Sequence, residues 1–477
     1  MDITAYPKKL LIIGNGFDLQ LGMHSSFKAF GAYRRKLLLN GPISSWTLID
    51  MLLEHRTNGR WGEEDGVTAN WDWWNFERFL RDSIINAIYN DDFLRMVTPT
   101  VGKVVKQKRV DFEKRAIGLV ATLSRDGYLT KQVTDKQPVF YVINREKLSN
   151  ITSQNIQNVP DGYFWQLLML SKIDTYYRKH SFEYRTNVYF SENVTEQDTE
   201  EITSTNVTSF ELENNVAALF PAFSMIKPLL IKELKIWESS FARFIADQQQ
   251  VATVGGLNYK ESSKRLIDSV LSVDHKQQYV QVLNFNYSLP TIEKTKYLHY
   301  YPLTPSLNIH GSIEDAEVSD SNISGIIIGY DYQILLDLPE LVDDMAPFTK
   351  TFRISELNTA LAKSPNNSRN MHLNYEVDKI SIIGHSLSSA DDSYFRTIFD
   401  AADLYDGTVI LEYRYTNYPG RDQSISIETE SLQKINALLI RYVTASRQEN
   451  KDNLLHKLLL ENRLILREYK TNEIMKL

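Results

Sequence analysis

Several apolar runs of the sequence end in short polar segments that contain glycine, and the first segment has residue types that bind phosphate. Residues 14–18 read GNGFD and follow the apolar run Leu10 to Ile13. Glycines let a backbone approach an anion closely, and the start of a helix supplies oriented amides. The pattern fits an anion-binding turn, and it also fits a plain turn between a strand and a helix. Leu19 stands where the third glycine of the Gly-x-Gly-x-x-Gly fingerprint is needed, so a standard dehydrogenase is not supported.

Two later segments carry amide and imidazole side chains. Asn284 and Asn286 end the run from Tyr279 to Phe285, where paired donors and acceptors could hold a sugar hydroxyl or a water. Asparagines at strand ends are also common turn formers. His310 precedes Gly311 after a short apolar run, and it is a candidate general base or a structural histidine.

Two more segments complete the set. Gly384, His385 and Ser386 follow the run Lys379 to Ile383, and residues 388–392 offer N-cap side chains to a following helix. Gly329 and Asp331 flank a tyrosine after the run Gly325 to Ile328. Each segment alone is ordinary. Because several of them follow strands of one predicted sheet, together they indicate a site.

The apolar runs themselves indicate how these segments are positioned. The runs at 10–13, 279–285, 306–309, 325–328, 379–383 and 408–413 are typical of strands buried on both faces. A strand, a glycine turn and a helix open the chain, as in a doubly wound α/β fold, where ligands bind beyond the carboxyl ends of the strands. The sequence therefore predicts a Rossmann-like α/β protein with a mostly parallel sheet.

The strands fall in two distant parts of the chain. We expect a discontinuous core of residues 1–67 and 277–427, and a mainly helical insertion at 68–276 with a hairpin at 183–210. A C-terminal helical segment is expected at 428–477. No repeat with a period of 20 to 50 residues is evident.

Composition excludes several classes of protein. The chain has 477 residues, of which 43% are hydrophobic and 24% charged, so it is long and apolar enough to bury a core. A net charge of −7 disfavours a surface devoted to nucleic acid. The absence of cysteine excludes disulfides, thiol catalysis and cysteine-based zinc sites. No secretory signal or membrane-spanning run is recognised, so we expect a cytoplasmic protein without membrane contacts.

The ordered motifs also resemble a known family. The series IIGNGFD from Ile12, WNFE from Trp74, NFNY from Asn284, His310-Gly311, GYD from Gly329 and GHSL from Gly384 is similar to the AbiH family of bacterial phage abortive-infection proteins. The resemblance spans residues 12 to about 395. It implies an anti-phage effector, with a phage-derived trigger and a homo-oligomer as its expected partners.

More distantly, the same series resembles sirtuin-like NAD-consuming defence domains. That resemblance implies that NAD is the substrate and is hydrolysed at the nicotinamide–ribose bond, with no metal. Asn286 would match the catalytic asparagine and His310 the catalytic histidine. The implied NAD-binding residues are Gly14, Asn15, Gly16, Phe17, Asp18, Asn284, Tyr287, Gly329, Asp331, Gly384, His385 and Ser386.

Two departures from the sirtuin pattern have consequences. The Asp18 carboxylate would repel a diphosphate unless it turns away or contacts a ribose. Sirtuins that remove acyl groups from proteins carry a four-cysteine zinc module, so protein deacylation is excluded here.

Alternatives remain open from the residues alone. Glu77 is either a carboxylate near the site or part of an aromatic core segment with Trp74. His299, His310 and Asp331 are the best candidates for a metal site, without a supporting spacing motif. Basic residues between Lys103 and Arg115 would suit RNA or a solvated helix face. The competing functions are therefore an NAD hydrolase, a defence nuclease, and a protein that senses a nucleotide or a phage component without cleaving it.

Overall fold

The structure is a computed structural model in which two compact units are described separately. It describes residues 8–40, 46–57, 60–63, 66, 68, 71–95, 125, 127, 129–134, 137–143, 187–189, 223–272, 278–290, 300–302, 307–313, 325–361, 376–417, 424–446 and 453–470. Unit 1 comprises residues 1–34, 69–80 and 235–477, and unit 2 comprises residues 35–68 and 81–234.

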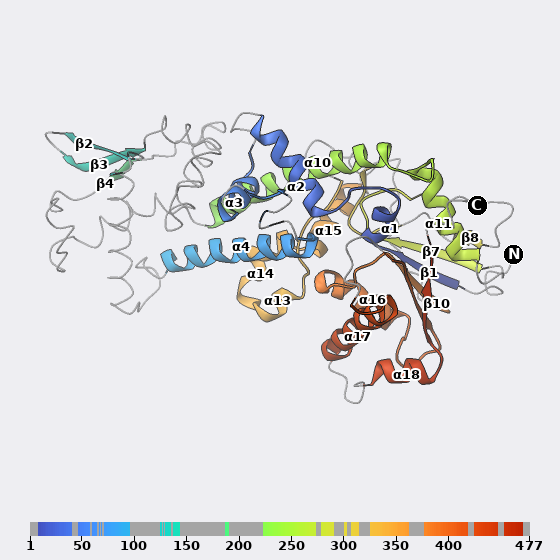
Figure 1. Ribbon diagram of the computed structural model, residues 1–477. Coiled ribbons are helices and arrows are strands. Elements are labelled where there is room, and N and C mark those ends of the chain that lie inside the picture. The colour runs from blue at the N-terminus through green and yellow to red at the C-terminus, as the bar shows by residue number, and fades with distance from the viewer. Residues whose placement is uncertain are drawn as a thin grey trace. The chain divides into compact units, whose positions relative to one another are not determined.

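Unit 1 is built on a parallel sheet (Figure 1). Its strands are β1 (Lys8–Ile13), β7 (Gln278–Asn284), β8 (Tyr300–Pro302), β9 (Leu307–Asn308), β10 (Lys379–Ile383), β11 (Ile410–Tyr415) and β12 (Leu464–Glu468). They pair in the order β12-β11-β10-β1-β7-β8, with β9 also paired to β7, and every pairing is parallel. This confirms the predicted α/β fold class.

The strand order places a switch point beside β1. From β1 the chain continues through β7 and β8 on one side and then returns to build β10, β11 and β12 on the other. The order corresponds to that of the doubly wound dinucleotide-binding fold, whose ligands bind where the order reverses. A ligand crevice is therefore expected between the loops that follow β1 and β10.

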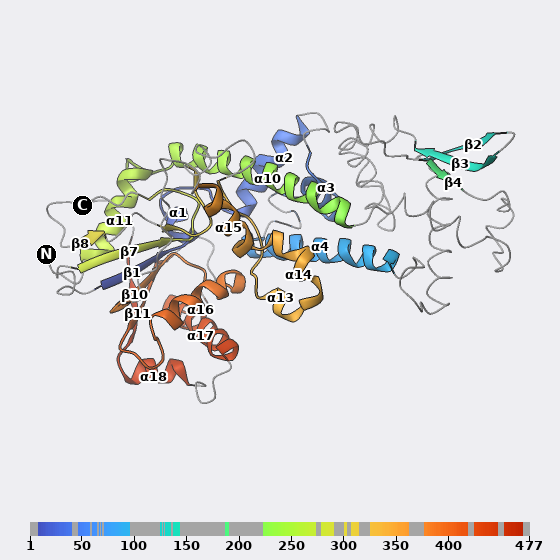
Figure 2. The same ribbon diagram turned by 180° about the vertical axis from the view of Figure 1, so that it is seen from behind.

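The two faces of the sheet differ in composition. Leu10, Ile12, Ile380, Ile382 and Leu411 belong to one buried apolar cluster. The cluster also includes residues of α16 (Asp392–Ala401), α17 (Ile427–Ser446) and α18 (Leu454–Leu460), which cover this face in both views (Figures 1 and 2). Alternate residues face the other side, because successive side chains of a strand point to opposite faces.

The opposite face buries a charged group on β11, next to the edge strand β12. Glu412 of β11 is fully buried and accepts hydrogen bonds from Ser381 and Arg414. Lys379 Nζ lies 3.5 Å from Glu412 Oε1, and Lys9 Nζ lies 4.0 Å from Oε2. Burial acts to raise the pKa of Glu412, but these cations outweigh it and lower the pKa to about 2. The paired charges make burial of this carboxylate tolerable.

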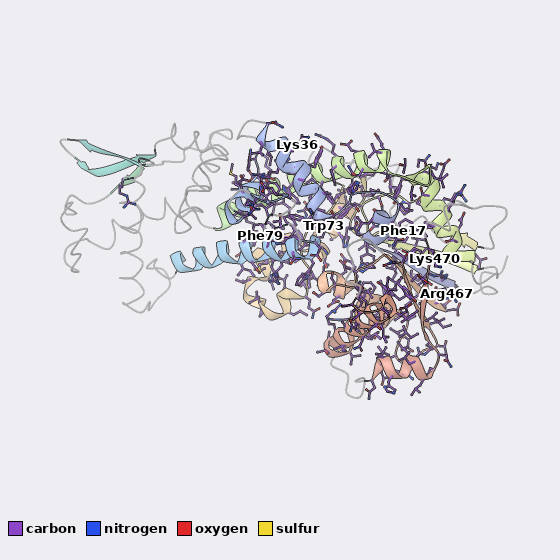
Figure 3. All side chains as sticks on the ribbon, in the orientation of Figure 1. Phe17, Lys36, Trp73, Phe79, Arg467 and Lys470 are labelled. Carbon is purple, nitrogen blue, oxygen red and sulfur yellow. The ribbon has the colours of Figure 1, made fainter. Side chains whose placement is uncertain are left out.

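The remaining helices of unit 1 include α1 (Asn15–Gln20), α11 (Tyr259–Ser272) and α15 (Lys350–Leu361). Short helices precede α15 and α16: α13 (Ile334–Asp337), η4 (Pro339–Leu341), α14 (Val342–Met345), η5 (Ala346–Phe348) and η6 (Ser389–Asp391). The hairpin β5 (Thr253–Val254) and β6 (Leu257–Asn258) precedes α11. Side chains fill the interior around the sheet, where Phe17 and Trp73 are labelled (Figure 3).

Three helices run from one unit's residues into the other's: α2 (Phe27–Leu39), α4 (Trp73–Arg95) and α10 (Phe223–Val251). Unit 2 also contains α3 (Leu48–Arg56) and an antiparallel sheet of β2 (Leu129–Thr134), β3 (Gln137–Ile143) and β4 (Asn187–Tyr189). No described helix is long and apolar enough to cross a membrane.

The structure differs from several sequence predictions. Residues 325–328 form no strand of the sheet, and Ile326 makes only an isolated bridge to Gly311. Residues 428–477, expected to be helical, also supply β12, and β8 was not expected. Residues 235–272, placed in the insertion by the sequence, belong to unit 1. Apart from β4, the predicted hairpin at 183–210 lies outside the described residues.

The loops after β1 and β10 are locked together at the switch point. Gly14 N donates to Ile383 O at 3.0 Å, and Gly16 N donates to Gly384 O at 2.6 Å. A Cβ at Gly14 would lie 2.5 Å from His385 Cα, and one at Gly384 would lie 2.2 Å from Phe17 N. Gly384 also has a φ of +68°, which side chains disfavour. These glycines are required because the two loops approach each other so closely.

We expect Gly384→Ala to destabilise the protein by about 3 kcal/mol or more, because strain at positive φ adds to a backbone clash. Gly256→Ala is a matched control: Gly256 has a φ of +80°, but its added Cβ would meet nothing within 4 Å. That variant should lose only about 1 kcal/mol. Chemical denaturation of both variants measures the difference, and equal losses would contradict the interlocked loops.

Candidate functional site

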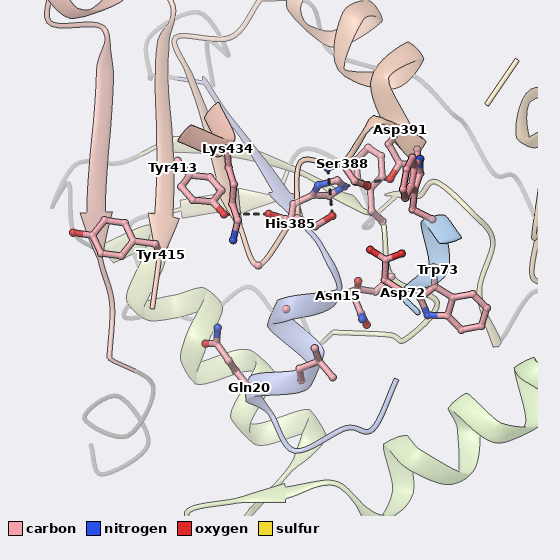
Figure 4. A pocket seen from close by; sticks show the side chains of 18 of the residues that line it. Asn15, Gln20, Asp72, Trp73, His385, Ser388, Asp391, Tyr413, Tyr415 and Lys434 are labelled. Carbon is pink, nitrogen blue, oxygen red and sulfur yellow. Dashed lines mark hydrogen bonds and ion pairs between the residues drawn. The ribbon is translucent and has the colours of Figure 1, made fainter. Parts of the chain in front are cut away.

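A pocket of about 470 Å³ opens at the carboxyl ends of the strands of unit 1. Asn15 and Gly16 line it from the loop after β1, and Gly384, His385 and Ser386 line it from the loop after β10. The pocket therefore lies at the switch point of the strand order. Figure 4 shows Tyr413, Tyr415 and Lys434 at one end of the pocket, and Asp72, Trp73 and Asp391 at the other.

The Asp391 carboxylate is the centre of a buried ionic cluster at the second end. Its Oδ1 lies 2.9 Å from Lys350 Nζ and 3.2 Å from His310 Nε2, and its Oδ2 lies 3.4 Å from His385 Nε2. Burial acts to raise the pKa of Asp391, but Lys350 and the two imidazole donors hold it well below its usual range. Asp391 is therefore an anion that orients both imidazole rings.

Glu77 shares the same lysine. Its Oε1 lies 3.0 Å from Lys350 Nζ, and both side chains are buried. Burial raises the pKa of Glu77 to about 8 although Lys350 acts to lower it. Burial also acts to lower the pKa of Lys350, but Asp391 and Glu77 outweigh it and raise that pKa well above its usual range. One ammonium compensates one carboxylate, and Asp391, with two further donors, is the one that ionises.

His310 directs one ring nitrogen at Asp391, and the other ring nitrogen has no partner among the residues that the structure describes. Because Nε2 faces a carboxylate, it must carry the ring proton, which leaves an acceptor lone pair on Nδ1. Burial lowers the pKa of His310, against the opposing effect of Asp391, so the ring is neutral at pH 7. His310 Nδ1 is buried and has no hydrogen-bond partner among the described residues. This arrangement is that of an oriented general base.

Asn286 presents a second buried acceptor. Its backbone N–H donates to Asn284 Oδ1 at 3.0 Å, and its Nδ2 donates to Gly14 O at 3.0 Å. The side chain is thereby fixed, with Oδ1 buried and without a partner in the described part of the chain. Both Asn286 and His310 line the pocket, and the His310 ring packs on those of Phe285 and Tyr287, the two neighbours of Asn286.

Several predicted binding residues support the loops instead of lining the pocket. Asn284 Nδ2 donates to Ser288 O and to Asn308 Oδ1, and Asp331 accepts hydrogen bonds from the backbone and side chain of Ser393. A Cβ at Gly329 would lie 2.6 Å from Phe348 O. The predicted residues that do not line the pocket are Gly14, Phe17, Asp18, Asn284, Gly329 and Asp331.

Asp18 turns away from the pocket. Its Oδ1 accepts a hydrogen bond of 2.8 Å from the Tyr259 hydroxyl, which also lies 2.9 Å from Ser288 Oγ. Burial raises the pKa of Asp18 to about 6, although hydrogen bonds from Ser288, Tyr259 and Asn286 act to lower it. Asp18 is therefore held by Tyr259 and does not line the pocket.

The predicted residues that do line the pocket are Asn15, Gly16, Asn286, Tyr287, His310, Gly384, His385 and Ser386. Among them, His385 is held on both sides, since its Nδ1 accepts from Leu387 N at 3.0 Å while Nε2 faces Asp391. The Tyr287 hydroxyl donates to Ile327 O at 3.2 Å. His310 and Asn286 are therefore the two with unpaired buried acceptors in the described structure.

One comparison with known proteins identifies the family. The family model described as bacteriophage abortive infection AbiH matches residues 10–413. The chain belongs to the AbiH family. No curated protein and no solved structure matches it. The abortive-infection role expected from the motifs is thereby supported at the level of the family.

Two residues of this AbiH site were not singled out by the sequence. Asp391 appeared only as one of several helix-capping residues, and Lys350 carried no local signal because it begins an otherwise ordinary amphipathic helix. Glu77 fits both of its alternatives. Its neighbours form an aromatic core in which Phe76 stacks on Trp237 at 4.5 Å, and its own carboxyl lines the pocket.

Two other candidate sites of the AbiH chain are only partly described. His299 and the basic residues between Lys103 and Arg115 lie outside the described residues. Within the described part, no group of three or more acidic or histidine side chains is arranged to hold a metal ion. Asp331, the third residue of the metal candidate, instead holds the start of α16 through Ser393.

We expect Glu77→Gln to stabilise the AbiH protein at neutral and alkaline pH. Because the pKa of Glu77 rises from 4.5 to about 8 on folding, wild-type stability falls as the pH rises through this range. The loss is at most about 1.4 kcal/mol per pH unit, and glutamine removes it while keeping an acceptor for Lys350. Melting temperatures between pH 5 and 8.5 measure the effect, with exposed Glu261→Gln as control. A stability gain that is the same at all pH values would contradict the protonated Glu77.

Proposed function

We propose that this AbiH protein binds NAD in the pocket and hydrolyses its nicotinamide–ribose bond as the effector step of abortive infection. The observation that carries the proposal is the pair of buried acceptors, Asn286 Oδ1 and His310 Nδ1, which have no partner in the described protein. A buried acceptor without a donor is costly, so a polar ligand or water is needed there. Two such acceptors suit a water and a ribose hydroxyl, both of which carry donors.

The reaction requires little more than a base and good positioning. Water oxygen forms a bond to the ribose C1′, and the bond from C1′ to the pyridinium nitrogen breaks. Its electron pair passes to the ring, so nicotinamide leaves as a neutral molecule without a general acid. His310 Nδ1 accepts the proton that water loses and returns it to solvent. Asn286 Oδ1 orients the water or the ribose hydroxyl while positive charge develops on the sugar, as in glycoside hydrolysis.

Binding of the nucleotide draws support from the position and lining of the pocket. It lies at the switch point of a doubly wound sheet, and its volume falls within the range of small-molecule sites. At the end away from Asp391, the rings of Tyr413 and Tyr415 suit a base, and Lys434, which is paired with Glu430 at 2.5 Å, is the cation that could reach a phosphate.

The sequence of the glycine turn suggests that its backbone amides bind phosphate, but these amides have other partners. Gly14, Gly16 and Phe17 each donate their backbone N–H to a carbonyl of unit 1. These amides are therefore engaged in the fold, and the phosphates of NAD would be held mainly by side chains. Nucleic-acid cleavage and nucleotide sensing without cleavage are the competing outcomes of the test below.

We expect purified protein to release nicotinamide and ADP-ribose from NAD, in isolation or after addition of lysate from phage-infected cells. His310→Gln and Asn286→Ala should each lower kcat/KM by about 10²- to 10⁴-fold. His456→Gln, at an exposed histidine of α18, should have no effect. Because the neutral His310 ring is the active form and its pKa lies below 6.5, kcat/KM should stay level from pH 7 to 8 and fall only below pH 6.5.

Chromatography of the products decides among the functions. No nicotinamide release in either condition would refute the hydrolase. If NAD then still raised the melting temperature, the pocket would be a sensor. If it did not, binding of nucleic acid and its dependence on salt would be measured next, because contacts with phosphates weaken steeply as salt increases. Release that both variants retain would remove His310 and Asn286 from the mechanism.

A further inference from the structure

We propose that Glu77 is a general acid of this pocket, and that the enzyme also hydrolyses the N-glycosidic bond of ordinary purine nucleotides. The inference rests on the proposed function, because it uses the same base, His310, and the same ribose position. It extends the substrate class from a cationic leaving group to a neutral one. The proposal stands on where Glu77 lies and on which other groups share its lysine.

The chemistry of the leaving group distinguishes the two substrates. Nicotinamide leaves as a neutral molecule because it starts as a cation. A purine joined to ribose is neutral and would leave as an anion unless a proton reaches one of its ring nitrogens. A site that hydrolyses NAD alone needs no acid, whereas a site that also carries a buried acid can release purines.

Glu77 is placed to meet a base in the pocket. It lines the pocket from α4, together with Trp73 and Trp74, which precede it by four and three residues. The first turns of α4 therefore bring a carboxyl and aromatic side chains to the same pocket. Aromatic rings stack on nucleobases, and a carboxyl beside them is within reach of the ring edge.

The surroundings of Glu77 keep the proton on it. Oε1 accepts from Lys350 at 3.0 Å, so Oε2 is the oxygen that carries the proton in the neutral form. The charged and titratable groups that act on it come from four segments; they are Lys350, Asp391, Asp331, Tyr287 and Tyr394. The single cation among them is already paired with Asp391. The raised pKa of Glu77, about 8, agrees with this placement.

The two carboxyls have opposite tasks as a result. Asp391 stays ionised and orients His310, the base, while Glu77 stays protonated and serves as the acid. Titratable groups whose environments separate their pKa values in this way are the usual basis of paired acid and base catalysis. Lys350 lies between the two carboxyls and causes the difference between their pKa values, because its single positive charge compensates only one negative charge.

The proposed step is balanced in atoms and charge. Water oxygen bonds to C1′ of the nucleotide, and the bond from C1′ to the purine nitrogen breaks with its electron pair going to the base. The Glu77 proton passes to the purine, and the proton lost by water passes to His310 Nδ1. The products are the free purine and the ribose phosphate. Transfer of the proton from His310 through solvent to Glu77 restores the starting enzyme.

The test compares purine release with nicotinamide release in the same preparations. ATP, GTP and NAD are each incubated with the full-length protein, with and without infected-cell lysate, and free adenine, guanine and nicotinamide are separated by chromatography. We expect adenine or guanine release, and we expect Glu77→Gln to lower the ratio of kcat/KM for ATP to that for NAD by about 10²-fold or more. Glu261→Gln should leave this ratio unchanged.

The pH profile gives a second readout. Hydrolysis of ATP needs a neutral His310 and a protonated Glu77, so kcat/KM should form a bell that falls above about pH 8. The profile for NAD should lack this alkaline limb, because its leaving group needs no acid. A melting temperature of Glu77→Gln at or above that of wild type excludes misfolding as the cause of a lowered ratio.

The outcomes separate the inference from the function on which it rests. Nicotinamide release without any purine release from ATP or GTP would overturn the inference and leave the NAD hydrolase standing. Release of neither would overturn both. Purine release with an unchanged ratio in Glu77→Gln would remove Glu77 as the acid, and a lowered ratio with an alkaline limb only for ATP would establish it.

Discussion

The candidate site depends on one buried ammonium group placed between two carboxyls. Lys350 lies 2.9 Å from Asp391 and 3.0 Å from Glu77, and all three side chains are nearly inaccessible to water. A single positive charge in a medium that hydrates poorly stabilises one negative charge. The imidazole donors of His310 and His385 decide that Asp391 is the ionised partner. From that choice follows the proton on Glu77, whereas burial keeps His310 neutral against the opposing effect of the ionised Asp391.

The arrangement is possible because the fold brings distant segments of the chain to one edge of the sheet. Glu77 lies in the first turns of α4, Lys350 is the first residue of α15, and Asp391 is the last residue of η6, which follows β10. Interlocked loops at Gly14 and Gly384 fix the register of this edge. The glycines that resemble a phosphate-binding turn therefore have a structural role that is sufficient to explain them.

The sequence predicted the fold well where its signals are local. Short, mostly apolar runs identified β1, β7, β10 and β11, because strands buried on both faces are rich in apolar residues even where a polar side chain such as Ser381 or Glu412 is buried among them. Residues 325–328 have a similar apolar composition but meet residues 310–312 through an isolated bridge and backbone hydrogen bonds instead of a ladder of the sheet, and composition does not contain that information. β12 is a run of three apolar residues, Leu464 to Leu466, followed by Arg467 and Glu468, and it continues the helical spacing of the residues before it, so the sequence alone predicts a helix there.

The residues of the site could likewise be predicted only where the sequence carries a local signal. His310, His385 and Asn286 belong to short motifs that come directly after strands, so their positions could be inferred from the sequence. Lys350 and Asp391 act through partners far away in the chain, and nothing adjacent to them signals this. The sequence allowed Glu77 to be either a carboxylate of the site or part of an aromatic core segment. Both are correct, because an aromatic core holds α4 while the Glu77 carboxyl lines the pocket.

The protonation state of His310 is the most direct test of this account. Nitrogen NMR of protein labelled with ¹⁵N at histidine, with His310 assigned by its loss in His310→Gln, reports the proton on each ring nitrogen. We expect a neutral ring at pH 7 with the proton on Nε2 and an unprotonated Nδ1. A doubly protonated ring at pH 7, or a neutral ring with its proton on Nδ1, would contradict it, since neither leaves a base directed away from Asp391.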